Sequence, residues 1–333
     1  MQAQIGGSST YKFLDLPFSA REAALGGNLI TVKDDDINLT FHNPALISPQ
    51  MDNNFAFSFV NYISDISYGY AAYSKTFNKI GSFVGGVQYV DYGKFIEADP
   101  TGLITGSFKA ADYSYNIGYS HPIDSVFSVG ATLKTVYSHL DQYFSVGSVV
   151  DAGGTYYNAR HLLSASAIIR GIGYQWKTYV DGNREPVPFE IQLGISKKLQ
   201  KAPFRLSLIG THLEKWDLTY EDPANPAPTK DPLTGAPIKK NETKIFADKL
   251  GRHLIANVEM LLGKNFMLRF GYNYQRRKEL RIDGRGGIPG FSFGLGFKIY
   301  KFNFSYGYAQ YHVAAGSSHF TVTTNISDFY RKK

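Results

Sequence analysis

The sequence contains no cysteine among its 333 residues and only 2 tryptophans. The absence of cysteine excludes disulfide bonds and thiolate metal sites. No stretch approaches the roughly 18 consecutive apolar residues that indicate a membrane-spanning helix. Hydropathy does not detect a transmembrane β-barrel, however, because polar residues facing the lumen alternate with apolar residues facing lipid along each strand.

What the chain does have is aromatic residues and glycine: 24 Tyr, 24 Phe and 33 Gly. In the segments 266–275, 291–298 and 301–308, large aromatic or aliphatic residues alternate with glycine and small or polar residues. A period of two places the rings on one face of a strand and the small residues on the other. A soluble β-sandwich or barrel also alternates, but rarely carries so many rings outside opposite so much glycine. The pattern therefore favours an outer-membrane β-barrel, with the rings facing lipid.

We predict an all-β protein: a transmembrane antiparallel β-barrel of about fourteen strands, an even number as in single-chain bacterial barrels. The expected strands cover residues 54–62, 66–77, 81–92, 109–121, 125–140, 142–156, 160–173, 187–199, 202–215, 250–262, 266–278, 289–300, 301–311 and 318–327. We expect three regions: an N-terminal hatch over residues 1–53, the barrel over 54–327, and a C-terminal tail over 328–333.

The connections between these strands alternate between short and long. Every second connection is a short turn, whereas the long ones, at residues 93–108, 174–186, 216–249 and 279–288, all fall at the other end. In outer-membrane barrels the periplasmic turns are short and the outer loops are longer. We therefore expect a bacterial outer-membrane location, extracellular long loops, and both termini on the periplasmic side.

The N-terminal 53 residues do not resemble strands. Residues 19–27 suit a short helix that two glycines stop, and an acidic run, Asp34 to Asp36, follows it. Then come Asn43, Pro44 and Ala45, a sequence that suits a tight turn because the residue before a proline is conformationally restricted. We expect this turn to pack inside the barrel. An exposed acidic turn explains the three aspartates better than a cation site does.

The longest connection, residues 216–249, is a candidate docking surface for a partner at the cell surface; the alternative is an outer loop without a binding role. Proline stiffens such a loop and removes backbone donors. The candidate partner-binding residues are Trp216, Pro223, Pro226, Pro228, Pro232, Pro237, Lys239 and Lys240.

A basic cluster lies where the eleventh expected strand meets its long loop. It consists of Arg276, Arg277, Lys278, Arg281 and Arg285. Arginine pairs well with phosphate, so this cluster is a candidate contact with lipopolysaccharide, and a solvated basic rim is the alternative.

We expect no catalytic site. His139, Asp141 and Ser145 lie close together in the sequence, but no oxyanion-hole motif accompanies them, and surface hydrolysis needs a nucleophile and a base in one site. We also expect no metal site, no cofactor and no nucleic-acid partner.

The segment 19–27, the acidic run after it and His42 to Ala45 together resemble the N-terminal hatch of the FadL-like outer-membrane family, whose barrels have fourteen strands. Within that family, the segments 5–7, 11–14, 61–69, 250–253, 270–274 and 279–281 are similar to PorQ-like barrels of the type IX secretion system. The resemblance covers nearly the whole chain.

The resemblance implies a non-enzymatic anchor in the attachment complex of type IX secretion. The barrel would hold a PorZ-like surface protein and act with PorU- and PorV-like components, which remove the sorting signal of cargo and link the cargo to lipopolysaccharide. The alternative is FadL-like transport of hydrophobic small molecules. That alternative requires an apolar cavity between the hatch and the wall.

Overall fold

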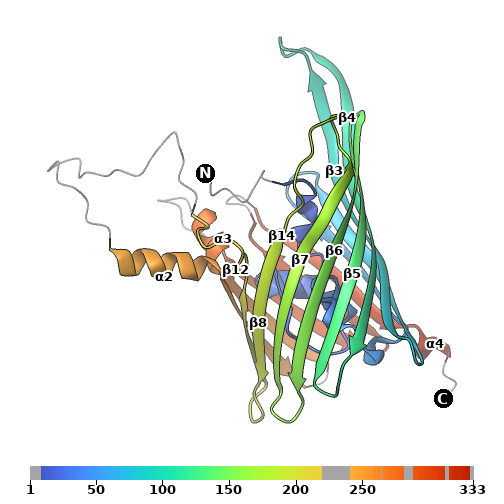
Figure 1. Ribbon diagram of the computed structural model, residues 1–333, viewed down its shortest axis with the longest axis vertical. Coiled ribbons are helices and arrows are strands. Elements are labelled where there is room, and N and C mark those ends of the chain that lie inside the picture. The colour runs from blue at the N-terminus through green and yellow to red at the C-terminus, as the bar shows by residue number, and fades with distance from the viewer. Residues whose placement is uncertain (1–8, 220–240, 264, 281–287, 312–314, 331–333) are drawn as a thin grey trace.

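The structure is a computed structural model that describes residues 9–219, 241–263, 265–280, 288–311 and 315–330. Fourteen antiparallel strands form a closed barrel, because each strand pairs with its neighbours in sequence and β1 pairs with β14 (Figure 1). Closure leaves no strand edge unpaired, which a barrel in lipid requires. The predicted fold class and strand number are confirmed.

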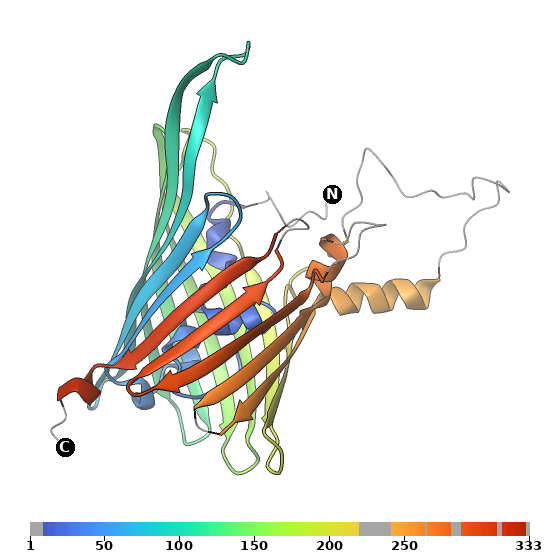
Figure 2. The same cartoon turned by 180° about the vertical axis from the view of Figure 1, so that it is seen from behind.

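The strands differ greatly in length. Their bounds are β1 Asn54–Asn61, β2 Ser67–Phe77, β3 Gly81–Ala98, β4 Ile104–Pro122, β5 Phe127–Leu140, β6 Tyr143–Asn158, β7 Leu163–Lys177, β8 Glu190–Lys198, β9 Phe204–Gly210, β10 Leu254–Leu262, β11 Phe266–Asn273, β12 Phe291–Ile299, β13 Phe302–Ala309 and β14 Ser317–Asn325. The barrel rim is therefore high on the side of β3 to β7 and low on the side of β8 to β14 (Figures 1 and 2).

The wall alternates as predicted. On β12, the side chain of Phe293 is 41% exposed on the outside, whereas that of Ser292 is 2% exposed and faces the lumen. Phe293 stacks on Tyr308 of the next strand, with ring centroids 5.2 Å apart. The outer surface is thus apolar and aromatic, as a lipid-facing wall must be.

The predicted loop over residues 93–108 is wrong in extent. Strands β3 and β4 continue through most of it, and only residues 99–103 form the connection. Cross-strand contacts explain the longer hairpin, since the rings of Phe95 and Phe108 stack 5.0 Å apart above the rim. Ile96, Leu103 and Ile104 are each more than 60% exposed near its tip.

Two predicted strands are too long because their ends are helical. Helix α2 covers Glu242–Arg252, so β10 begins at Leu254 and not at residue 250. Helix α3 covers Tyr274–Glu279, so β11 ends at Asn273. Asparagine caps start both helices: Asn241 accepts a hydrogen bond from the backbone N–H of Lys244, and Asn273 accepts one from that of Arg276. In the part of the chain that the structure describes, no helix has the length and apolar character needed to cross a bilayer.

The N-terminal segment lies inside the barrel (Figure 2). Its helices are the 3₁₀ turns η1 Lys12–Asp15, η2 Ile37–Phe41, η3 Pro44–Leu46 and η4 Pro49–Met51, and the α-helix α1 Ala20–Ala24. Side chains of this segment and of β1, β2, β3, β5 and β6 form the largest apolar cluster among the described residues. The lumen is therefore packed around the segment.

The described ends of the chain lie at opposite ends of the barrel. The backbone N–H of Thr10 donates to the carbonyl of Pro186, in a long connection, whereas helix α4, Ser327–Tyr330, lies at the short-turn end (Figure 1). The expectation that both ends lie on the short-turn side is wrong for the described residues. The reason is that residues 10–53 run through the lumen from one end to the other before β1 begins.

We predict that Phe293→Arg destabilises the barrel in a bilayer by roughly 2–4 kcal/mol, because a lipid-facing arginine must be desolvated. The control is Ile96→Arg, whose side chain lies on the hairpin above the rim. Equilibrium unfolding in lipid vesicles measures the free energy of unfolding of both variants. An equally small loss of stability in the two variants would contradict a lipid-facing Phe293.

Candidate functional site: the hatch and the cavity above it

Helix α1 is short, and its start is defined by a capping box. Ser19 accepts a hydrogen bond from the backbone N–H of Glu22, and its hydroxyl donates to the Glu22 carboxyl at 3.0 Å. Every residue of α1 is buried. A helix of five residues is not stable alone, so the surrounding wall must hold it.

The wall approaches the hatch so closely that glycine is required on both sides. A Cβ atom added at Gly307 of β13 would lie 2.2 Å from the carbonyl oxygen of Ala20. After α1, Gly27 adopts a φ of +92°, and a Cβ there would lie 2.6 Å from the Arg276 guanidinium. The lumen-facing glycines of the alternating strands thus make room for the hatch.

Ser292 shows that this part of the lumen is filled and not wet. Its hydroxyl accepts a hydrogen bond from the backbone N–H of Gly26 at 2.9 Å and donates to the carbonyl of Ala24 at 3.0 Å. A large side chain at this position would displace the hatch. We therefore expect Ser292→Arg to destabilise the protein at least as much as an arginine on the lipid-facing side of the wall.

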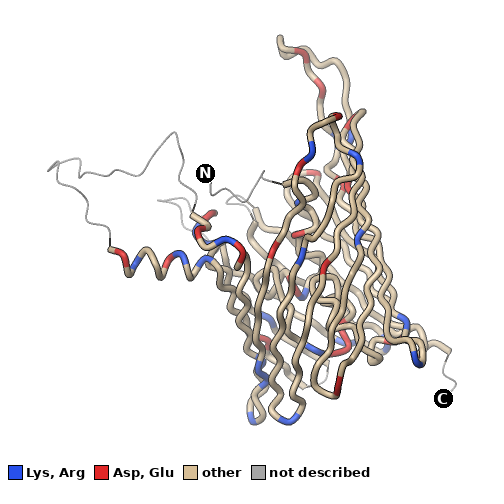
Figure 3. Tube along the Cα trace, in the orientation of Figure 1, with Lys and Arg blue, Asp and Glu red and all other residues tan. Residues whose placement is uncertain are grey.

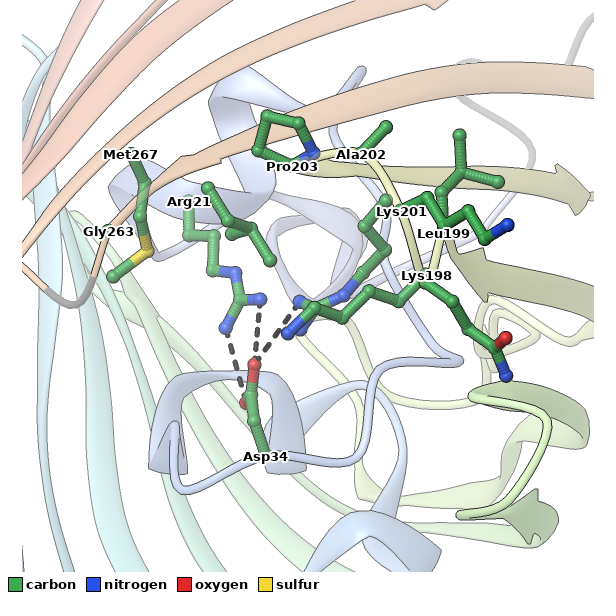
Figure 4. Close-up of a pocket in the computed structure, with 12 residues that line it drawn as sticks. Arg21, Asp34, Lys198, Leu199, Lys201, Ala202, Pro203, Gly263 and Met267 are labelled. Carbon is green, nitrogen blue, oxygen red and sulfur yellow. Dashed lines mark hydrogen bonds and ion pairs between the residues drawn. The ribbon is translucent and has the colours of Figure 1, made fainter.

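Arg21 of α1 is the centre of a buried ion-pair network. Its Nε atom lies 2.9 Å from Glu259 of β10, and its terminal nitrogens lie 2.9 Å from Asp34 and 2.9 Å from Asp36. Arg205 of β9 joins the same carboxylates, at 2.7 Å from Glu259 and 3.4 Å from Asp34. Figure 4 shows Arg21 and Asp34 joined within the pocket of about 490 Å³ that opens toward the short turns.

The acidic run is therefore structural. Asp34 and Asp36 each pair with Arg21, while Asp35 is exposed. No group of three metal-ligating side chains occurs among residues that the structure describes.

A second buried cluster fixes the opposite wall. Lys134 of β5 lies 2.6 Å from Asp151 of β6, and Arg170 of β7 lies 3.6 Å from the same carboxylate. Arg170 also donates a hydrogen bond of 2.9 Å to the backbone carbonyl of Leu14 in the hatch. Both clusters thus connect the hatch to the strands through charges that are shielded from water.

Asn43, Pro44 and Ala45 lie in the lumen. The Asn43 side-chain amide donates to the carbonyl of Ile30 at 2.6 Å and to the Thr155 hydroxyl of β6 at 2.9 Å. Its oxygen accepts from the backbone N–H of Ala45 at 2.9 Å, which closes the turn. All three residues are buried.

Above the hatch, at the end with the long connections, lies a cavity of about 770 Å³. The turn at Gly26 and Gly27 forms part of its lining, as do the rings of Tyr62 and Tyr311. Further apolar lining comes from Leu16, Leu218 and Ile255. The basic side chains in the lining are Lys12, Arg170, His212, Arg252, Arg276 and Lys278, and the acidic ones are Asp15, Glu190 and Glu279. The cavity thus combines apolar surface with an excess of cationic groups.

Arg276 occupies a defined position in this cavity. Its guanidinium lies 4.1 Å from the centre of the Tyr311 ring, within the range of a cation–π contact. The Tyr311 ring in turn lies 5.8 Å from that of Tyr62. Arg276 is therefore held between the hatch turn and two tyrosines, where a guanidinium can bind an acidic group of a ligand.

His212 adds a titratable group. Its Nδ1 atom lies 3.5 Å from Glu214 and 3.7 Å from Glu190. Burial alone would lower the pKa of His212, but the hydrogen bond with Glu214 and the charge of Glu190 raise it above the ordinary value. The protonated form of His212 is thus favoured more than in a free imidazole.

The predicted basic cluster is divided by the structure. Arg276 faces the cavity, the guanidinium of Arg277 lies 3.5 Å from the Pro289 carbonyl oxygen, and Lys278 pairs with Asp248 of α2 at 2.8 Å. Arg281 and Arg285 lie outside the described residues.

Of the predicted partner-binding residues, only Trp216 lies in a described segment. It is 48% exposed, and its ring lies 5.5 Å from that of Phe246 in α2. Pro223, Pro226, Pro228, Pro232, Pro237, Lys239 and Lys240 lie outside the described residues.

His139, Asp141 and Ser145 do not meet. Ser145 is buried in the lumen, where it hydrogen-bonds Tyr11 of the hatch at 2.6 Å, while His139 and Asp141 are exposed. The period of two explains the separation, because His139 lies on the opposite face of its strand from the buried Ser138, the cross-strand partner of Ser145.

Sequence reasoning missed the residues that hold the hatch: Arg21, Glu259, Lys134, Asp151 and Arg170. The sequence did contain one indication of such a buried ion pair. Glu259 occupies an inward position of a strand that otherwise alternates, and a charge there demands a partner in the lumen. The identity of that partner depends on how residues 19–53 fold, which the alternation does not reveal.

No family model and no curated protein matches the sequence. Solved structures do match in fold. The toluene transporter TodX of Pseudomonas putida is 12% identical, with a TM-score of 0.53 over 92% of this chain and 96% of that chain. The toluene transporter TbuX of Ralstonia pickettii is 13% identical, with a TM-score of 0.50 over 93% and 97%. A FadL homologue of Pseudomonas aeruginosa is 11% identical, with a TM-score of 0.50 over 92% and 98%.

These similarities, at such low identity, concern the fold. The chain has the architecture of an outer-membrane barrel of the FadL-like kind, a closed wall of fourteen strands around an N-terminal hatch. Of these structures, TodX and TbuX are described as toluene transporters.

We predict that Arg21→Met destabilises the protein by about 3–5 kcal/mol, because it removes the central cation of the buried network: Asp36 loses its ion pair, and Glu259 and Asp34 each lose one of their cationic partners. The control is Lys12→Met, which removes a partly exposed pair with Asp15 and should cost at most about 1 kcal/mol. Thermal unfolding in detergent compares the two. Equal stability of both variants would show that the network does not hold the hatch.

Proposed function

We propose that this chain binds hydrophobic small molecules with an acidic group at the outer end of its barrel and passes them across the outer membrane. The cavity above the hatch carries this proposal. Its volume of about 770 Å³ lies within the range of small-molecule sites, and its tyrosines and aliphatic side chains surround a fixed guanidinium. In this proposal the long connections face the cell exterior and the short turns face the periplasm.

The shared fold supports transport of apolar molecules, since TodX and TbuX are described as toluene transporters. The lining suggests a different ligand from toluene. The Arg276 guanidinium would be costly beside a neutral hydrocarbon, because a charge that loses water needs a partner. A carboxylate or phosphate on an apolar body would supply that partner.

The hatch makes this a gated route. Below the cavity the lumen is occupied by buried residues of α1 and the turns after it. We propose that the ligand displaces the turn at Gly26 and Gly27, while the ion pairs of Arg21 keep the lower hatch in place.

The test is binding of a fluorescent long-chain fatty acid to the purified protein. Arg276→Gln should weaken the affinity about tenfold or more, because it removes a charge-assisted hydrogen bond in a partly desolvated site. Lys301→Gln, at the opposite end of the barrel, should leave the affinity unchanged. Equal affinity of the wild type and Arg276→Gln would exclude the cavity as the site.

The same assay has a pH dependence. The charge of His212 is fully present below its ordinary pKa of roughly 6.5 and is lost as pH rises through its raised pKa. The affinity of the wild type for an anion should therefore fall as pH rises through the raised pKa of His212. His212→Gln should remove that fall, and a fall of the same size in the variant would assign it to another group.

A second candidate is the anchor of a surface attachment complex of the type IX secretion kind, as the PorQ-like sequence resemblance implies. Two observations favour it. The hatch is held by two buried charge clusters, and the hairpin of β3 and β4 rises above the rim with apolar side chains exposed. Exposed apolar residues of this kind suit a protein partner, which would be PorZ-like, with PorU- and PorV-like components.

The hairpin tests this candidate. Replacing Ile96, Leu103 and Ile104 with serine should leave a folded barrel, because these side chains lie at the tip and beyond the lumen contacts. The variant should lose the surface partner in a pull-down from native outer membranes, with mass spectrometry as the readout. Retention of the same partners would reject the hairpin as the docking site. Fatty-acid binding should be unchanged in this variant, because no hairpin residue lines the cavity.

A further inference from the structure

Helix α2 ends at the level where the membrane should end. β10 has nine residues, and a tilted strand of about 9–11 residues is just long enough to cross a bilayer. Only His253 separates the last residue of α2, Arg252, from the first residue of β10, Leu254. The helix is therefore fixed at the level at which the lipid-facing wall stops.

From this level α2 extends sideways. Figures 1 and 2 show it directed away from the barrel, roughly across the direction of the barrel axis, on the low side of the rim. None of its eleven residues is buried. A helix in this position lies over the lipid that surrounds the barrel and not over the lumen.

The base of α2 is fastened to the protein on one side. Asp248 accepts a hydrogen bond from the Tyr274 hydroxyl and pairs with Lys278, each at 2.8 Å, so this face of α2 is turned toward α3. Hydrogen bonds from Lys278, Tyr274 and Arg252 outweigh the effect of burial and lower the pKa of Asp248 to about 2, so the contact is charged at neutral pH.

The opposite side of α2 is apolar. Phe246 and Leu250 are four residues apart and therefore share a face, which at 100° per residue points away from Asp248. Phe246 is 57% exposed and Leu250 is 41% exposed, and the half-exposed ring of Trp216 lies beside Phe246. Figures 1 and 2 show α3 above the barrel end of α2, on the side away from the strands. Since Asp248 faces α3, the opposite, apolar face of α2 is on the side of the membrane.

The wall near this face is itself a lipid surface. Strands β8 to β12 carry an apolar groove of about 670 Å³, lined by outward side chains such as Leu206, Leu208, Val258 and Phe270. Helix α2 leads directly into β10, one of the strands that carry this groove. A tryptophan at such a boundary is typical of membrane interfaces, since its ring is both apolar and a hydrogen-bond donor.

We propose that α2, together with Trp216, is an interfacial anchor that lies flat on the bilayer, with Phe246 and Leu250 inserted at the boundary between lipid headgroups and acyl chains. Figure 3 shows Lys and Arg positions along the helix; Lys249 pairs with Asp217 and Arg252 pairs with Asp248, while Lys244 lies on the polar side, as in an amphipathic helix at a membrane surface. The anchor would hold the barrel at a fixed depth and orientation. It would do so whether the barrel transports a ligand or holds a partner.

The proposal is tested by the depth of a single tryptophan. Trp176→Phe and Trp216→Phe remove both natural tryptophans, and Phe246→Trp or Lys244→Trp then supplies one probe on either face of α2. The folded variants are placed in vesicles of phosphatidylethanolamine and phosphatidylglycerol. Fluorescence is quenched from the lipid side by brominated acyl chains and from the water side by iodide.

With the anchor, the probe at position 246 should be quenched by brominated lipid and several-fold less by iodide than the probe at position 244. The heat-modifiable band of each variant on a gel reports that the barrel is folded. Strong iodide quenching and no lipid quenching at position 246 would overturn the proposal. Protection of position 246 in native outer membranes but not in vesicles would also overturn it, because a protein partner would then cover the face.

Discussion

The contact between Arg21 and Glu259 is the interaction on which the rest of the structure depends. It joins the hatch to the wall through two charges that are almost fully shielded from water, and Asp34, Asp36 and Arg205 complete the network. Unpaired, any of these charges would be costly inside the barrel. The network therefore selects one position of the hatch, and the lumen, the cavity above it and the exposed faces follow from that position.

The packed lumen places the two candidate functions in different parts of the molecule. Binding of a small molecule depends on the cavity at the Gly26–Gly27 turn, where charge and aromatic surface meet. Docking of a partner depends on the hairpin of β3 and β4, which rises from the high side of the rim. Both candidate functions are compatible with a hatch that the ion pairs of Arg21 hold in place on the short-turn side of the cavity.

The uneven rim has a further consequence. On the side of β3 to β7 the strands continue beyond the length that crosses a bilayer, while β8 to β14 have seven to nine residues and stop near its boundary. Elements next to the ends of the short strands lie near this boundary, and α2, which leads directly into β10, has an exposed apolar face there, with Trp216 beside Phe246. The barrel thus presents a tall face to possible partners and a low face to lipid.

The sequence by itself determined the barrel, the strand number and the lipid-facing side chains, because the period of two is a local property of each strand. It also indicated that residues 19–45 form a compact unit, through the capping serine, the paired glycines and Pro44. Only the tertiary structure decided that Arg21 meets Glu259 across 238 positions, that Arg276 faces a cavity and that the end of the longest connection is a helix at the rim. Such contacts depend on how the hatch is threaded through the closed wall, and a local pattern carries no information about that path.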